Sequence, residues 1–266
     1  MSTRKDAVAG QFYPADKDEI VKMFTHYNEI IDKAITDEAV LSLKPRAIIV
    51  PHAGYVYSAF TANIAFRLLK NSKPKRVVVI GPSHRVYVES TSVSMFESFE
   101  TPLGDLPIDK SLANEMIEEL GLRFQSDAHA EHSTEVQMPF IKYYLPQSSV
   151  VELVYGNEKA IKLSKVINHL LSDPDTAVVI STDLSHYYDQ QKANKLDSIC
   201  LDAVLKLDPN ELHEGCEACG KIGVEAMILS AREKGLKTTL LDYRTSADAS
   251  GDTSQVVGYM SAAFVE

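Results

Sequence analysis

The sequence predicts an α/β fold with a mostly parallel central sheet covered by helices. Segments with helical and strand patterns alternate along the whole chain, as they do in α/β proteins. Runs of consecutive β-branched residues, bounded by Pro, Gly or Ser, occur at 46–50, 76–80 and 176–181. Such runs are typical of strands buried on both faces of a parallel sheet. No repeat or linker divides the chain, so we expect one domain over residues 1–266.

The spacing of apolar residues sets the individual elements. Apolar positions recur with helical spacing after Asp16, which predicts a first helix over 17–34. Further helices are predicted at 58–70 (with Ser58 as N-cap), 109–121, 136–146, 157–173, 188–207 and 221–234. Strands are predicted at 46–50, 76–80, 149–156, 176–181, 238–244 and 255–266. Residues 90–109 contain several turn residues and are expected to form short antiparallel strands.

Composition excludes several classes of protein. The 27 basic and 37 acidic residues give a net charge of −10, whereas a nucleic-acid binder would show a basic face. No apolar run approaches the ~20 residues of a membrane span, and the polar N-terminus does not resemble a signal peptide. Three cysteines are too few, and odd in number, for a disulfide framework. We therefore expect a soluble cytoplasmic protein that binds neither nucleic acid nor membrane.

Three histidines follow the β-branched runs. They are His52, His84 and His186. In open α/β sheets ligands bind at the carboxyl ends of the strands, so these imidazoles are expected to face one crevice. His52 and His84 then form the first half of a metal site, because neutral imidazole is a common metal ligand.

Two other segments add candidate site residues. Asp183 precedes His186 and is expected to orient His186 or a ligand histidine; the alternative is that it caps the following helix. Residues 129–140 contain Glu131 and His132, for which we expect a role in orienting a ligand or contacting substrate. The metalloprotease pattern H-E-x-x-H is absent, and Glu131 could instead complement a helix dipole.

The remaining candidates are less specific. The Ser/Asp/Gly-rich segment 245–254 is either a polar turn or a site loop that carries Asp248 or Asp252. The C-x-x-C pair at 216–219 lacks a second pair, so we predict neither a zinc nor a redox site there, only partly buried thiols. Cys200 is expected to be a core residue.

Six motifs in series give the chain a family resemblance. GQFYP, PHAGYVYSA, GPSH, EHSTEVQMPF, STDLSH and the loop before VVGY resemble the Memo family, whose prokaryotic members include AmmeMemoRadiSam system protein B. The resemblance implies a fold similar to class III (LigB-like) extradiol dioxygenases. It also implies metal ligands at His52 and His84, and a site that includes Asp183, His186, Glu131 and His132. Functional association with radical SAM and AMMECR-type proteins is implied by the same resemblance.

The chain departs from the family at the third ligand. Eukaryotic members have a cysteine where Ala249 stands here, and the neighbouring Asp248 could supply an oxygen instead. Two histidines and a carboxylate favour non-haem Fe(II), with copper or zinc as alternatives. Asp248 would need a turn at 247–249 to face inward, since adjacent residues of an extended segment point opposite ways.

Three functions are compatible with these residues. The first is a metal-dependent oxidoreductase of dioxygenase type that acts on a small molecule, with His186 as general acid–base. The second is a non-enzymatic binding or adaptor protein that uses the crevice for a peptide or anionic ligand. The third is metal-assisted hydrolysis. Whether the chain is an enzyme, and its substrate, are left open by the sequence.

Overall fold

The computed structural model describes residues 3–266 and contains one eight-stranded sheet. Its strand order is β3-β6-β2-β7-β1-β10-β8, and β9 pairs with β10. The strands are β1 (Ala47–Val50), β2 (Arg76–Pro82), β3 (Thr91–Val93), β6 (Ser149–Tyr155), β7 (Thr176–Ser181), β8 (His186–Tyr188), β9 (Lys237–Thr245) and β10 (Val256–Val265). A separate two-stranded pair is formed by β4 (Ser98–Phe99) and β5 (Leu106–Pro107).

The centre of the sheet is parallel and its edges are antiparallel. Strands β6, β2, β7 and β1 pair in parallel, whereas β3, β9 and β10 pair antiparallel with their neighbours. Adjacent residues of one strand face opposite sides, so Ile48 and Ile49 of β1 enter different hydrophobic clusters, both fully buried. This explains why the central strands are uninterrupted apolar runs.

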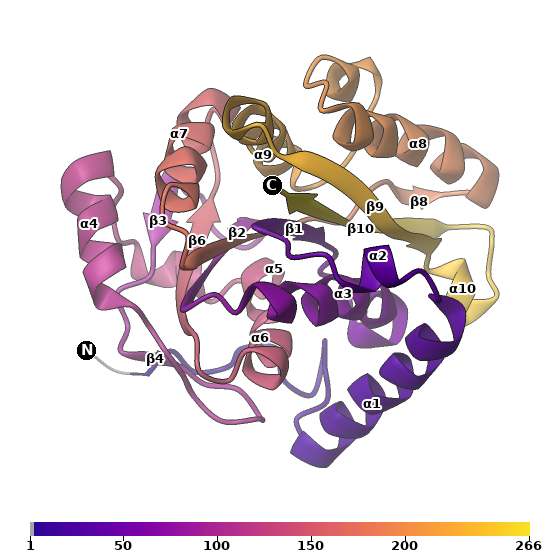
Figure 1. Ribbon diagram of the computed structural model, residues 1–266, viewed down its shortest axis with the longest axis horizontal. Helices are drawn as coiled ribbons and strands as arrows, with labels where there is room; N and C mark the ends of the chain where they lie inside the picture. Colours follow the sequence, from indigo (N-terminus) through magenta and orange to yellow (C-terminus); the bar gives the residue numbers. More distant parts are fainter. Residues whose placement is uncertain (1–2) are drawn as a thin grey trace.

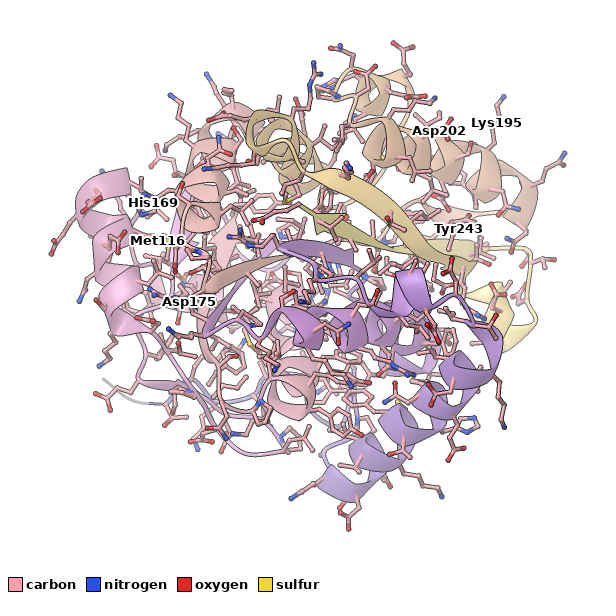
Figure 2. The ribbon with its side chains drawn as sticks, in the orientation of Figure 1. Met116, His169, Asp175, Lys195, Asp202 and Tyr243 are labelled. Carbon is pink, nitrogen blue, oxygen red and sulfur yellow. A yellow bond between two sulfur atoms is a disulfide. The ribbon has the colours of Figure 1, made fainter. Side chains whose placement is uncertain are left out.

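Helices cover both faces of this sheet (Figure 1). One face carries α1 (Lys17–Ala34), α3 (Tyr55–Leu69) and α6 (Met138–Tyr144). The other carries α4 (Lys110–Leu120), α7 (Ala160–Leu171), α8 (Gln190–Lys206) and α9 (Lys221–Lys234). Figure 2 shows Met116 of α4 near His169 of α7, consistent with the hydrogen bond of 2.5 Å between His169 Nε2 and Glu115 Oε1. The predicted fold class is confirmed.

The predicted elements are close to the observed ones, with a few corrections. Ser58 is not an N-cap, because α3 begins at Tyr55 after the N-cap Gly54, and the Ser58 hydroxyl, inside the helix, donates to the carbonyl of Ala53 that precedes it. Four short elements were not predicted: α2 (Glu38–Leu41), α5 (His132–Glu135), α10 (Ala247–Ser250) and β8. Elements of three or four residues are too short to show a period.

The expectation that Cys216 is a partly buried thiol was wrong. Cys200 of α8 and Cys216 are joined by a disulfide, with their Cα atoms 5.0 Å apart. The short 3₁₀ segment η3 (Glu211–Glu214) turns the chain back so that Cys216 reaches α8. Pairing two of three cysteines leaves Cys219 as the free one. Cys200 is fully buried, as predicted for a core residue.

Reduction of this disulfide should destabilise the fold. The bridge spans 16 residues, and closing a loop of about this length stabilises a protein by roughly 3 kcal/mol. We expect a lower midpoint of chemical denaturation in the presence of a reductant. The Cys200→Ala/Cys216→Ala double variant should show the same midpoint with and without reductant. An equal shift in that variant would show that the reductant acts elsewhere.

No helix within residues 3–266 is long and apolar enough to cross a membrane. The cytoplasmic location stays a prediction, and a disulfide is uncommon in most cytosolic proteins.

Candidate metal centre

The sheet brings three of the predicted segments to one edge. His52 and His84 follow the carboxyl ends of β1 and β2, and Asp183 follows the end of β7. Strand β7 lies between β2 and β1 and pairs in parallel with both. The three loops therefore leave the sheet side by side and in the same direction, as the strand pattern predicts.

A third histidine joins His52 and His84, and it is His132. One ligand nitrogen from each of the three rings lies within 4.8 Å of the others. The ring centroids are separated by 5.2 Å for His52–His84, 5.5 Å for His52–His132 and 4.7 Å for His84–His132. His132 is the first residue of the short helix α5, which contacts β2.

Glu131 fixes the orientation of two of these rings. Its Oε1 lies 2.8 Å from His132 Nδ1 and 3.3 Å from His84 Nδ1, and its Oε2 accepts the backbone N–H of His84 at 2.6 Å. Burial would raise the pKa of Glu131, but the hydrogen bonds from His132, His84 and Ser133 outweigh it and hold the pKa well below its usual range. The group is thus a carboxylate, which only accepts hydrogen bonds. Both Nδ1 atoms must donate, so in the neutral form of each ring the lone pair is on Nε2.

Ser181 fixes the orientation of the His52 ring. The Ser181 hydroxyl gives its single proton to the carbonyl of Ser133, so it accepts a hydrogen bond from His52 Nδ1 at 3.0 Å. His52 Nε2 is then unprotonated. Burial, followed by the nearby His84 and His132, holds the pKa of His52 well below its usual value. In the neutral form of each of the three rings, Nε2 is therefore the nitrogen left to bind a metal ion.

Asp183 and His186 lie beside this cluster. Asp183 Oδ1 accepts the backbone N–H of His52 at 2.7 Å, so the carboxylate positions the loop that carries His52 rather than a histidine ring. Burial raises the pKa of Asp183, and the nearby His186 opposes this rise. The loop is also held by the buried Asp197 of α8, which accepts the N–H of Ser185 at 2.9 Å and the hydroxyl of Tyr243 at 2.7 Å.

The cluster opens into a cavity of about 660 Å³. His52, His84, His132, Asp183 and His186 all line it. Tyr187, at its rim, has the left-handed backbone conformation with φ of 63°, which costs a non-glycine residue about 1–3 kcal/mol. Pairing of His186 and Tyr188 with Val257 and Val256 of β10 holds it there. A volume of this size suits a small molecule.

Comparison with known proteins finds relatives over almost the whole chain. The family model described as "Memo-like protein" matches residues 4–263. The chain belongs to the Memo family. It is 34% identical over 276 residues to a MEMO1 family protein of Aquifex aeolicus, covering 100% of both chains. It is 30% identical to one of Thermoplasma volcanium, covering 97% of both, and 34% identical to one of Methanopyrus kandleri, covering 98% of both. These names state a family and no reaction.

In this Memo-family chain Asp248 is not brought into the histidine cluster. Its carboxylate accepts the backbone N–H of Thr245 at 2.8 Å and so closes the turn that starts α10. Ala249 lies in the same short helix. The predicted turn at 247–249 therefore forms, but it directs Asp248 to its own backbone. Asp252, the other candidate of this loop, lines the cavity.

Sequence reasoning missed one residue of the site, Cys219. Its Sγ lies 3.3 Å from His52 Nε2. Burial, and then the nearby Asp183, raises the pKa of this thiol to about 12, so it is a neutral S–H that donates to His52. A Cβ on Gly220 would lie 2.6 Å from Thr182 Cβ, so only glycine lets this segment approach the site loop. The Cys-Gly pair before a helix was the available signal.

Proposed function

We propose that this Memo-family chain is a metal-dependent enzyme that holds a divalent transition-metal ion on His52, His84 and His132 and acts on a small molecule in the adjoining cavity. One observation carries the proposal: one nitrogen from each of three imidazoles lies within 4.8 Å of the others, and the Nδ1 atom of each ring has a hydrogen-bond partner. Ligand histidines almost always have such a partner.

The resemblance to class III extradiol dioxygenases is the reason for proposing Fe(II) and an oxidation. Imidazole suits iron, copper, zinc and nickel alike, so the donor set alone does not select the metal. When bound, such an ion would supply Lewis acidity and, for iron or copper, electron transfer. Glu131 increases the basicity of two ligand imidazoles through their N–H groups. His186, which lines the cavity without being one of the three clustered histidines, is the group available to move a proton to or from the substrate.

Metal-assisted hydrolysis is the second candidate, because the three-histidine set admits zinc as well as iron. Three neutral imidazoles also hold catalytic zinc, which leaves one position open for reaction. The two functions share their ligands but differ in the metal and in the need for oxygen.

Anaerobic titration with Fe(II) and with zinc, followed by activity assays, separates the two functions. We expect one ion per chain, and oxygen uptake by the Fe(II)-loaded protein in the presence of catechols. Hydrolysis of nitrophenyl esters or phosphates by the zinc-loaded protein alone would favour the second function. Absence of both activities with the metal bound would leave a metal-binding protein and refute the proposed catalysis. His213→Ala, which removes an exposed histidine paired with Glu225, is the control.

Glu131→Gln should weaken metal binding without removing a ligand. The amide is neutral, and its nitrogen can no longer accept a hydrogen bond, so His84 and His132 lose part of their fixed orientation. Loss of such outer partners typically lowers metal affinity by about 10–100-fold, measurable by competition with a chelating dye. Glu225→Gln, which alters the His213–Glu225 pair outside the cluster, should have no effect. Equal affinities of the two variants would refute the orienting role of Glu131.

A further inference from the structure

The walls of the cavity beyond the histidines have a distinct chemistry. Four aromatic side chains line it, from Phe12, Tyr57, Tyr187 and Tyr259. The carboxylate of Asp252 adds negative charge at the exposed rim. Among the described residues no lysine or arginine lines this cavity. The lining therefore offers rings and carboxylates, and no fixed positive side chain for a phosphate or carboxylate ligand.

Three tyrosines line the same cavity as the histidines and Asp183: Tyr57, Tyr187 and the buried Tyr259. Tyr57 and Tyr187 are nevertheless 44% and 71% exposed, so their rings border the opening as well. Exposed aromatic faces beside a carboxylate are the surroundings in which proteins recognise organic cations.

A bound divalent ion does not give the site a preference for anionic ligands over organic cations. The three ligand histidines are neutral, and the carboxylates of Glu131 and Asp252 together balance a divalent ion. The chain as a whole carries a net charge of −10, which favours the approach of cations over anions. An anionic ligand thus finds no excess positive charge outside the metal itself.

We propose that the substrate of this enzyme is a small organic cation, an amine or quaternary ammonium compound, recognised by the rings of Tyr57 and Tyr187 and the carboxylate of Asp252. This inference rests on the proposed function, because it assigns the substrate class of the same cavity. It differs from the peptide or anionic ligand that the sequence offers for a non-enzymatic binding protein.

Three probes of similar shape and different charge test the proposal. Choline, 3,3-dimethylbutan-1-ol and 3,3-dimethylbutanoate are titrated calorimetrically into metal-free and zinc-loaded protein. We expect choline to bind about tenfold more tightly than the neutral alcohol in both forms, and the anion to bind most weakly to the metal-free form. Equal binding of choline and the alcohol, tighter binding of the anion to the metal-free form, or no saturable binding of choline would overturn the proposal.

Matched pairs of variants identify the side chains that cause the preference for choline over the neutral alcohol. Asp252→Asn keeps the Oδ1 that accepts the N–H of Ser254 and should remove most of the preference for choline. Asp208→Asn makes the same change in an equivalent turn, where Oδ1 accepts the N–H of Asn210, and should keep it. Tyr57→Leu/Tyr187→Leu should also lose the preference, whereas Tyr87→Leu, an equally exposed tyrosine outside the cavity, should not.

Metal content, measured on the same samples, separates the two proposals. A stoichiometric metal without cation preference refutes only the substrate class, whereas absence of metal refutes the proposed function.

Discussion

His132→Ala is expected to weaken metal binding by more than about 100-fold, as much as His52→Ala or His84→Ala. Each change removes one of three nitrogens that lie within 4.8 Å of one another, and loss of a direct ligand should exceed the 10–100-fold effect of an outer partner. Elemental analysis after dialysis against a weak chelator measures the loss. The folded state should persist, since a chain of this size buries enough surface to fold without metal.

Asp248→Ala distinguishes the two possible centres. The sequence predicts that Asp248 completes a site of two histidines and a carboxylate, whereas the structure places its carboxylate on Thr245. We expect the Asp248→Ala variant to bind metal as the unmodified chain does. Loss of metal from this variant, with retention by His132→Ala, would restore the two-histidine, one-carboxylate centre.

Glu135→Ala should cause the largest loss of stability, about 3–5 kcal/mol, because it leaves a buried charge without its partner. Glu135 is fully buried and pairs with Arg4, which is 4% exposed. It also accepts the backbone N–H groups of Ala7 and Val8 and the hydroxyl of Tyr13, each at 2.8 Å. Urea denaturation followed by circular dichroism measures the change in the free energy of unfolding.

The neighbouring ion pair provides the control for this prediction. Lys5 follows Arg4 in the N-terminal segment, and Glu100 follows β4. Both side chains of this pair are partly exposed. Exposed pairs contribute little, so Glu100→Ala should leave the denaturation midpoint almost unchanged. Similar losses in both variants would show that burial of the Arg4–Glu135 pair is not the cause. The N-terminal segment also places Phe12 against His132, with ring centroids 4.7 Å apart, so Glu135→Ala should reduce metal affinity as well.

Local sequence patterns were sufficient to predict the fold and two of the three clustered histidines. Uninterrupted β-branched runs identify β1, β2 and β7, because strands covered on both faces have no polar side. His52 and His84 follow directly, since the residue after a parallel strand must lie at its carboxyl end. Elements of three or four residues, such as α5 and β8, leave no period and were missed.

Tertiary contacts decided which side chains complete the site. His132 joins His52 and His84 because Glu131 holds it across 47 residues of sequence from His84, and no pattern near His132 records that contact. Cys219 reaches His52 from 167 residues away, and its segment is tied to α8 by a disulfide whose partners lie 16 residues apart. Asp248 does not reach the cluster because its carboxylate accepts the backbone N–H of Thr245 in the turn at the start of α10. The sequence by itself determined the strands and the two histidines that follow them, since both depend on neighbouring residues. The third histidine, the orientation of all three rings and the place of the free cysteine depend on hydrogen bonds between distant segments, which only the folded chain brings together.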